Sequence, residues 1–336
     1  MTQKIIAKEE LYKQLNSLAK DFEIIGPKDL FNKGFFYERL DSAQELYLGE
    51  GFTTEPVKKF FLSPSEWLFN CQYNNGKNSL EELSLPDKKR IIIGVRPCEA
   101  RGLILLDQVF GSQGYKDEFY LNNRRRTIII GLACAKPDAA CFCTSLAGSP
   151  VESRGMDVII FAKGDEEFIL EIVTDKGKEI FGALGQVLNE TEKESHALEK
   201  EKNKELVIPK IKVPESLCSI FEDAYWQEVS RACLDCGICT FLCPTCHCFD
   251  LVDEQRKKLR CYDGCAFADF TVEASGVNPR PTKKERYQQR VFHKFEYFKK
   301  NFGENLCVGC GRCIRHCPVK IDIREVVTNI PVTENK

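Results

Sequence analysis

Two stretches of this 336-residue chain repeat one cysteine pattern, which restricts the local fold more than any other feature. Residues 233–244 and 307–318 both read C-x2-C-x2-C-x3-C-P. This spacing is typical of the bacterial run that binds a [4Fe–4S] cluster. Three thiolates on a tight loop can reach three corners of one cubane. We expect the fourth to leave on a helix that starts near the proline and to point at the other cluster.

The repeated pattern therefore predicts two [4Fe–4S] clusters with exchanged fourth ligands. The first cluster is expected on Cys233, Cys236, Cys239 and Cys317. The second cluster is expected on Cys307, Cys310, Cys313 and Cys243. Zinc would need only paired C-x2-C motifs, and it leaves the x3-C-P tails unexplained. Two clusters of this kind indicate a protein that carries single electrons.

Composition excludes several other classes of protein. The net charge of −2 and the pI near 6.2 provide no basic field for nucleic acid or an anionic membrane. Eighteen cysteines could suggest disulfides, but such frameworks belong to short secreted chains. The first twenty residues lack a signal-peptide core, and apolar stretches such as 128–133 are too short to span a bilayer. We expect a cytoplasmic protein of anaerobic metabolism, with no nucleic-acid partner and no membrane span.

Residues 1–210 are predicted to form an α/β domain. The apolar run 91–95 is typical of a buried parallel strand, Pro97 opens a helix through Phe110, and a second buried strand follows at 127–132. Together they form a β–α–β unit whose strands should be parallel. A helix is expected within 5–20, and further strands are expected at 22–25, 35–40, 157–161 and 168–173. Residues 188–206 are rich in Glu and Lys, which indicates a solvated helix or linker.

Residues 211–336 are predicted to be helical apart from the cysteine loops. One helix is expected over 249–260 and another over 286–302. The second has an apolar stripe made of Tyr287, Val291, Phe295, Phe298 and Phe302. The long helical insert between the two cysteine runs favours an α-helical ferredoxin architecture over the compact ferredoxin, which keeps its runs close together.

A third group of cysteines comes from the α/β domain. Cys98 and Cys134 each follow one of the two predicted parallel strands, so both lie at the carboxyl edge where open α/β sheets bind ligands. Cys141 and Cys143 lie in the loop just after Cys134. Four thiolates at one edge suit an iron–sulfur cluster or zinc. The alternative is that they are buried, inert thiols.

A fourth group follows the first run directly and consists of Cys246, Cys248, Cys261 and Cys265. It could hold one more cluster, or some of its members could be packing thiols. Cys71 and Cys218 are isolated, and we interpret both as core or surface cysteines. The chain has neither a P-loop nor a dinucleotide-binding glycine motif. We therefore expect FAD and NAD(P) on a partner protein.

Six segments between about 85 and 330 carry a family resemblance. They are GVRPCEARGLILLD, GLACAKPDAACFC, RACLDCGICTFLCPTCHCFD, CYDGCAF, NPRPTKKERYQQRVFHKF and LCVGCGRCIRHCPVKIDI. In these segments the chain resembles the iron–sulfur beta subunit of cytoplasmic sulfhydrogenases, which are NAD(P)-linked [NiFe] hydrogenases, and the related iron–sulfur subunit of anaerobic sulfite reductases. Residues 1–80 match only loosely.

The resemblance implies an electron conduit that connects a reductase subunit, which binds flavin and NAD(P), with a catalytic hydrogenase or sulfite reductase subunit. It implies three or four [4Fe–4S] clusters. The third-site motif corresponds to Cys98, Cys134, Cys141 and Cys143. The fourth-site motif corresponds to Cys246, Cys248 and Cys265, with Cys261 as an extra cysteine. No catalytic centre is evident in the chain, so its standing as an enzyme by itself stays open.

Two other functions are compatible with the sequence. The chain could be an autonomous iron–sulfur enzyme that acts on a sulfur or thiol species at an open cluster on Cys246, Cys248 and Cys265. It could also be a scaffold protein whose clusters are structural. Turnover by the single chain would favour the first alternative, and clusters that cannot be reduced reversibly would favour the second.

Overall fold

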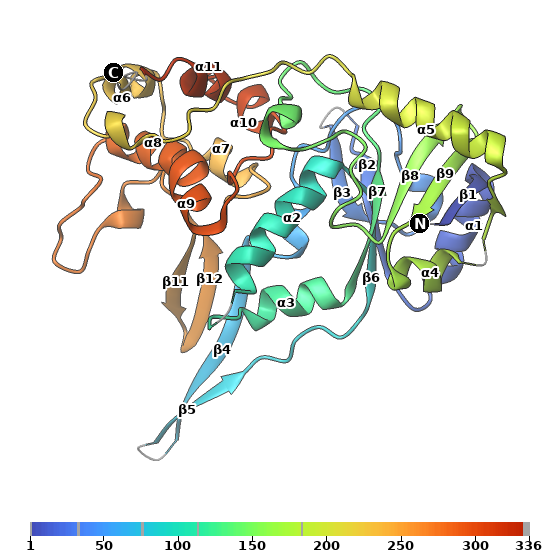
Figure 1. Ribbon diagram of the computed structural model, residues 1–336. Coiled ribbons are helices and arrows are strands. Elements are labelled where there is room, and N and C mark those ends of the chain that lie inside the picture. The colour runs from blue at the N-terminus through green and yellow to red at the C-terminus, as the bar shows by residue number, and fades with distance from the viewer. Residues whose placement is uncertain (1, 32–33, 75–76, 113, 183, 332–336) are drawn as a thin grey trace. The chain divides into compact units, whose positions relative to one another are not determined.

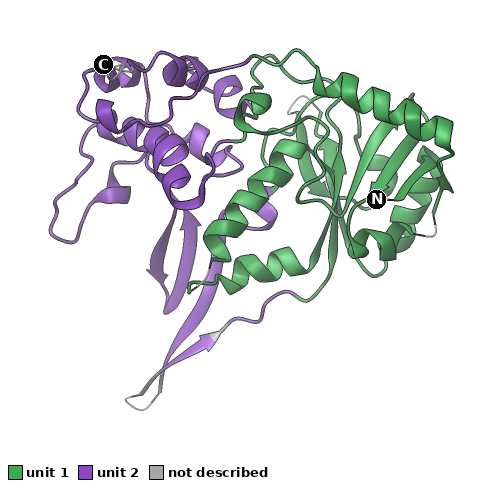
Figure 2. Cartoon of the chain, in the orientation of Figure 1, with its two compact units in different colours: residues 1–57, 87–209, 308–310 green, residues 58–86, 210–307, 311–336 purple. Residues whose placement is uncertain are grey.

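The computed structural model describes residues 2–31, 34–74, 77–112, 114–182 and 184–331. The chain divides into two compact units (Figure 2). Unit 1 comprises residues 1–57, 87–209 and 308–310. Unit 2 comprises residues 58–86, 210–307 and 311–336. Residues 58–86 thus group with a unit that lies mostly far downstream, and no local sequence pattern indicates this. The predicted division into a domain of residues 1–210 and a domain of residues 211–336 stays a prediction.

Unit 1 is built on a mixed eight-stranded sheet (Figure 1). Its order is β10-β1-β9-β8-β7-β6-β2-β3. The bounds are β1 Thr2–Ala7, β2 Glu23–Asp29, β3 Phe35–Arg39, β6 Arg90–Val95, β7 Thr127–Leu132, β8 Val158–Lys163, β9 Glu167–Ile172 and β10 Gln186–Val187. The four central strands β2, β6, β7 and β8 are parallel, and the outer pairs are antiparallel. The predicted parallel β–α–β unit is therefore confirmed.

Helices cover both faces of this sheet. They are α1 Lys8–Leu18, α2 Pro97–Phe110, α3 Glu118–Arg125, α4 Asp175–Phe181 and α5 Glu190–Lys204. In Figure 1, α2 and α3 lie on one face of the sheet, and α1 and α4 lie on the other. Strands β6 and β7 are buried along their whole length because both faces are covered. The helix expected from residue 5 begins only at Lys8, since residues 2–7 pair with β9 as strand β1.

Unit 2 contains a four-stranded antiparallel sheet of order β11-β12-β4-β5. Its strands are β4 Ser65–Asn74, β5 Lys77–Glu82, β11 Phe249–Glu254 and β12 Lys257–Tyr262. The helix expected over 249–260 is wrong, because β11 and β12 form a hairpin in that segment. Gln255 and Arg256 have φ of 48° and 64°, as a tight hairpin turn requires. Strand β12 also pairs with β4, so a distant segment stabilises the hairpin.

The rest of unit 2 is made of short helices. They are α6 Tyr225–Ser230, α7 Ile238–Phe241, α8 Lys283–Phe292, α9 Phe298–Phe302, α10 Arg312–Arg315 and α11 Ile323–Thr328. A π-helical turn at His293–Tyr297 joins α8 to α9. The predicted apolar stripe is buried from Tyr287 through Phe298, while Phe302 is exposed. Short 3-10 turns lie at Ala43–Glu45, Val57–Phe60, Cys143–Leu146, Cys218–Ile220 and Asp269–Thr271.

None of the helices within the described ranges is long and apolar enough to cross a membrane.

Candidate metal centres

The two cysteine runs share one backbone conformation. Gly237 and Gly311, at equivalent positions, both have φ of 72° and immediately precede the short helices α7 and α10. Asp235 and Gly309, also equivalent, have φ of 52° and 64°. The helices end before the prolines of the two runs, so the expectation of a helix starting near each proline is wrong. In each run the helix begins directly after the left-handed glycine, well before the proline. The fourth cysteine lies just beyond the end of that helix.

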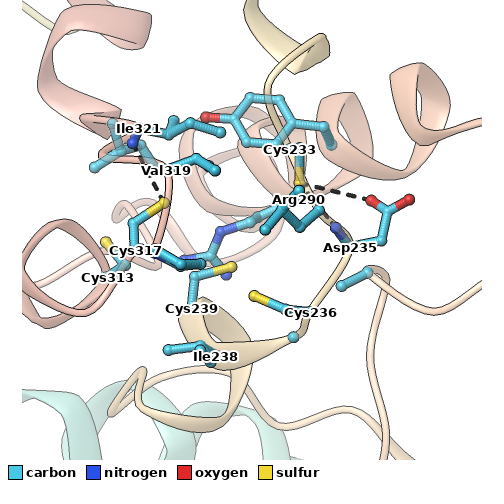
Figure 3. A pocket seen from close by; sticks show the side chains of 16 residues that line it. Cys233, Asp235, Cys236, Ile238, Cys239, Arg290, Cys313, Cys317, Val319 and Ile321 are labelled. Atoms are coloured by element: carbon cyan, nitrogen blue, oxygen red, sulfur yellow. Dashed lines mark hydrogen bonds between the residues drawn. The ribbon is translucent and has the colours of Figure 1, made fainter.

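The thiols expected at the first cluster line one cavity of about 50 Å³ in unit 2. Figure 3 shows the sulfur atoms of this set around a common space. The cysteines that line it are Cys233, Cys236, Cys239 and Cys317, together with Cys313. Residues from the two runs thus meet at one cavity, as the exchange of fourth ligands requires. Their ligation of a cluster remains a prediction.

Backbone amides point at two of these sulfur atoms. The N–H of Asp235 donates to Cys233 Sγ at 3.4 Å, and the N–H of Ile321 donates to Cys317 Sγ at 3.3 Å. Burial raises the pKa of the Cys233 thiol to about 11. Hydrogen bonds to cysteine sulfur stabilise negative charge on a bound cluster and adjust its potential. The cavity therefore has both the donor atoms and the surrounding N–H groups that a cluster needs.

Buried cations contact the thiols expected at the second cluster. Lys294 Nζ lies 3.2 Å from Cys243 Sγ. A hydrogen bond from Cys246, together with Lys294 and Arg290, holds the pKa of Cys243 well below its ordinary value. Cys307 acts electrostatically on Lys294, and Cys313 acts on Arg290. The fourth expected ligand, Cys310, is buried and belongs to unit 1.

The structure brings only part of the fourth group together. Cys246 hydrogen-bonds to Cys243, which was assigned to a different cluster. Burial raises the pKa of Cys265 to about 11, and its charged neighbours include Cys248. Cys261 lies on β12 opposite Asp250, and its pKa is raised by burial and then by the carboxylates of Asp250 and Asp263. The place of Cys261 in the fourth set stays a prediction.

The third group lies at the carboxyl edge of the sheet of unit 1. Cys98 is the second residue of α2, directly after β6, and Cys134 follows β7. Burial, reinforced by Cys141 and Cys134, raises the pKa of Cys143 to about 12. Three thiols of the set therefore lie close together, and Cys98 begins its helix at the same edge. The parallel topology places them there, as the sequence predicted.

The loop of the second run packs against the third group inside unit 1. The N–H of Phe142 donates to the Gly309 carbonyl at 2.8 Å, and Cys141 Sγ lies 3.9 Å from the Cys310 carbonyl oxygen. A Cβ on Gly309 would lie 2.5 Å from the backbone nitrogen of Cys143. Gly309 is therefore the residue that allows the two cysteine loops to touch. Sequence reasoning missed this contact, since the spacing of residues within one run does not tell which distant loop packs against it.

Sequence reasoning also missed a stripe of basic residues on α8 and the π turn. Each member contacts a cysteine or its loop: Lys283 donates to the Cys233 carbonyl, Arg286 pairs with Asp235 at 2.7 Å, and Arg290 donates to Cys246 Sγ at 3.4 Å. Lys294 is the last member. Their spacing of three and four residues was a readable signal, because such residues share one helical face. Lys58, brought in by residues 58–86, donates to the Cys246 carbonyl at 2.7 Å.

These donor sets fit iron–sulfur clusters. In the ranges that the structure describes, no group of three or more His, Cys, Asp or Glu side chains has the arrangement of a site for one metal ion. A cubane instead takes each thiolate on a separate iron. Sets made only of cysteine suit iron–sulfur clusters, and the buried cations and N–H donors offset the negative charge that such a cluster carries.

Comparison with known proteins agrees with this chemistry. Residues 232–321 match a family model described as a 4Fe-4S dicluster domain, so the chain is an iron–sulfur protein that contains a domain of this class. The chain is also 31% identical over 326 residues to sulfhydrogenase 2 subunit beta of Pyrococcus furiosus, covering 94% of each chain. It belongs to the family of sulfhydrogenase beta subunits, which confirms the resemblance seen in the sequence. No solved structure matches the chain.

Proposed function

We propose that this chain is an iron–sulfur electron-transfer subunit. It would pass single electrons between a reductase subunit, which binds flavin and NAD(P), and a catalytic subunit of hydrogenase or sulfite reductase type. One observation carries the proposal: cysteines of both runs line one cavity. The relative supports it because its name marks it as one subunit of a sulfhydrogenase. A cytoplasmic location is part of the same proposal.

The ligand sets follow the sequence prediction. Cys233, Cys236, Cys239 and Cys317 would hold the first cluster, and Cys307, Cys310, Cys313 and Cys243 would hold the second. Cys98, Cys134, Cys141 and Cys143 would hold a third, and Cys246, Cys248 and Cys265 would provide a fourth. Bound [4Fe–4S] clusters supply reversible one-electron chemistry. The chain itself supplies thiolates, N–H donors to sulfur and buried cations.

The contact between two cysteine loops supports passage of electrons through the chain. The hydrogen bond from Phe142 to Gly309 joins the backbone between Cys141 and Cys143 to the backbone beside Cys310. One ligand of the second set is thus in direct contact with the third set. FAD and NAD(P) would be bound by the reductase subunit, where the flavin divides electron pairs into single electrons.

Anaerobic purification of the native complex tests this function. We expect this chain to co-elute with a flavoprotein and with a subunit that carries nickel or sirohaem, as identified by mass spectrometry and metal analysis. The isolated chain should contain iron and sulfide and should be reduced and reoxidised reversibly. Turnover of a sulfur or thiol substrate by the single chain would contradict the proposal in favour of an autonomous enzyme. Clusters that cannot be reduced would indicate a scaffold.

A further inference from the structure

Two cations are buried in the middle of the cysteine loops of unit 2. Arg290, near the end of α8, is 5% exposed, and Lys294, one turn later in the π turn, is 2% exposed. A buried charge is costly unless it is paired. Both side chains donate to cysteine sulfur, and among the described residues no carboxylate forms an ion pair with either of them. Their partners are therefore the same sulfur atoms that the clusters use.

The Lys294 ammonium is held by three acceptors. Its Nζ lies 3.2 Å from Cys243 Sγ, 3.2 Å from Thr245 Oγ1 and 3.4 Å from the Leu306 carbonyl oxygen. The Thr245 hydroxyl in turn donates to the same carbonyl at 2.5 Å. Each of the three ammonium N–H groups thus has an acceptor, and one of these acceptors is the Cys243 sulfur. π-helical turns within α-helices occur frequently at functional sites, and this turn carries Lys294.

Arg290 faces several cysteine sets at once. Its Nη1 lies 3.4 Å from Cys246 Sγ, and its side chain lines the cavity of the first set (Figure 3). Cys239 and Cys313 are also among the thiols that raise its pKa. Its Nη2 is buried and has no hydrogen-bond partner among the described residues. The guanidinium therefore keeps an unused donor between the thiols.

The neighbouring Arg286 differs from these two cations because its partner is a carboxylate. Arg286 lies one turn earlier on the same face, and it forms an ion pair with the Asp235 carboxylate at 2.7 Å. Its charge is already balanced within the protein. Within the described part of the chain, Arg290 and Lys294 face cysteine sulfur rather than a carboxylate, so a cluster on those thiolates would interact with both charges. In a buried site, where the effective dielectric constant is low, such interactions are strong.

We propose that Lys294 and Arg290 set the reduction potentials of the clusters whose thiolates they contact, with Lys294 raising the potential of the cluster on Cys243. This inference rests on the proposed function. A [4Fe–4S] cluster with four thiolates is negative, and reduction adds one more negative charge. A fixed cation and a hydrogen bond to sulfur favour the reduced form, and both raise the potential.

The test is an anaerobic redox titration of the reconstituted chain with dithionite and mediator dyes, followed by EPR. The signal that disappears in Cys243→Ser identifies the cluster in question. In Lys294→Met we expect the reduced-to-oxidised ratio of that signal, at a fixed potential, to fall about tenfold, which is about 59 mV for a one-electron couple. Lys294→Arg should restore most of the ratio. Arg290→Gln should lower the reduced-to-oxidised ratio of the clusters whose thiols it contacts. Lys300→Met, at an exposed lysine of α9, is the control and should leave these ratios unchanged.

The possible results separate the inference from the function on which it rests. Equal potentials in Lys294→Met, Lys300→Met and the wild type, at equal iron content, would overturn the inference and leave the proposed function intact. If Lys294→Met does not retain the cluster, the titration is repeated with Lys294→Gln, which keeps an N–H donor but removes the charge. Loss of the cluster in both variants would assign Lys294 to cluster retention and would also overturn the inference. Wild-type clusters that are not reversibly reduced would contradict the proposed function itself.

Discussion

The cysteines of unit 1 and Cys243 of unit 2 lie in different electrostatic environments. In unit 1 burial dominates: it raises the pKa of Cys143 to about 12 and also raises that of Cys134, where Arg96 only partly opposes it. In unit 2, a hydrogen bond from Cys246, together with Lys294 and Arg290, lowers the pKa of Cys243, although burial raises the pKa of Cys233 and Cys265 to about 11. Burial disfavours a thiolate and a nearby cation favours it. The same donor atom thus has two environments in one chain.

This difference in burial and nearby charge explains how one chain could hold similar clusters at different reduction potentials. Burial in an apolar environment disfavours added negative charge, whereas fixed cations favour it. We therefore expect the cluster of unit 1 to have a lower potential than the cluster on Cys243. The backbone also differs: strand ends position the thiols of unit 1, while short loops and a basic helix surround those of unit 2.

The largest effect is expected for Cys313→Ser, which removes a thiolate of the second cluster. Iron per chain should fall, the EPR signal of that cluster should disappear, and NAD(P)H-linked turnover of the assembled complex should stop. Cys71→Ser, at an isolated cysteine, is the matched control and should leave all three measurements unchanged. Wild-type spectra and turnover in Cys313→Ser would show that the second ligand set is wrong.

The comparison between the units is tested most directly by Cys143→Ser. This change should remove the cluster of unit 1 and leave the EPR signals of unit 2 in place, because the sets share no thiol. Iron analysis and EPR of the isolated chain measure both effects. If the iron content stays constant, the thiols of unit 1 are packing residues. If a signal of unit 2 is lost instead, the sets are divided wrongly.

A third change acts at Gly309, which contacts the Cys143 backbone within unit 1. Gly309→Ala should lower the free energy of unfolding by about 3 kcal/mol, since a Cβ would collide with the Cys143 backbone and the residue has positive φ. Gly276→Ala is the control, because that glycine also has positive φ but no atom within 4 Å of the added Cβ. Urea unfolding followed by circular dichroism measures both. Equal losses would mean that backbone strain alone, and not the contact, accounts for the effect.

The smallest effect concerns an ionic group of unit 1. Glu171 on β9 is 2% exposed and accepts hydrogen bonds from His196 at 2.9 Å and Lys200 at 2.7 Å, both on α5. Burial opposes its charge, but these hydrogen bonds hold its pKa below the ordinary 4.5. The stabilisation is therefore complete above that value and is lost as the pH falls through the lower pKa of the folded state.

Glu171→Gln should thus cost about 1.5 kcal/mol of unfolding free energy at pH 7, and the difference from the wild type should shrink toward pH 3. Glu167→Gln, at an exposed ion pair with Lys163 on the neighbouring strand β8, should cost about 0.3 kcal/mol. Urea titrations over this pH range measure both. A cost for Glu171→Gln that is independent of pH would show that packing, and not the carboxylate charge, attaches α5 to the sheet.

Local patterns predicted much of the fold, and the cysteine sets that they indicated stay predictions. The all-apolar runs 91–95 and 127–132 identified the central parallel strands, and their ends correctly located Cys98 and Cys134 at one edge. The hairpin at 249–262 was predicted as a helix because its pairing partner β4 lies near residue 65, outside any local window. The start of each helix in the cysteine runs was misplaced for a different reason: the left-handed glycine, rather than the proline, begins it.

The identity and spacing of the cysteines follow from the sequence alone, because the three-cysteine loop that would reach three corners of a cluster is local to each run. The environment of those cysteines follows only from the tertiary structure. Lys58 reaches Cys246 across 188 residues, and Lys294 reaches Cys243 across 51. Gly309 touches Cys143 from another part of the chain. Electrostatic effects on a thiolate depend on distance in space, and only the folded chain brings these groups within 3–4 Å of sulfur and its backbone.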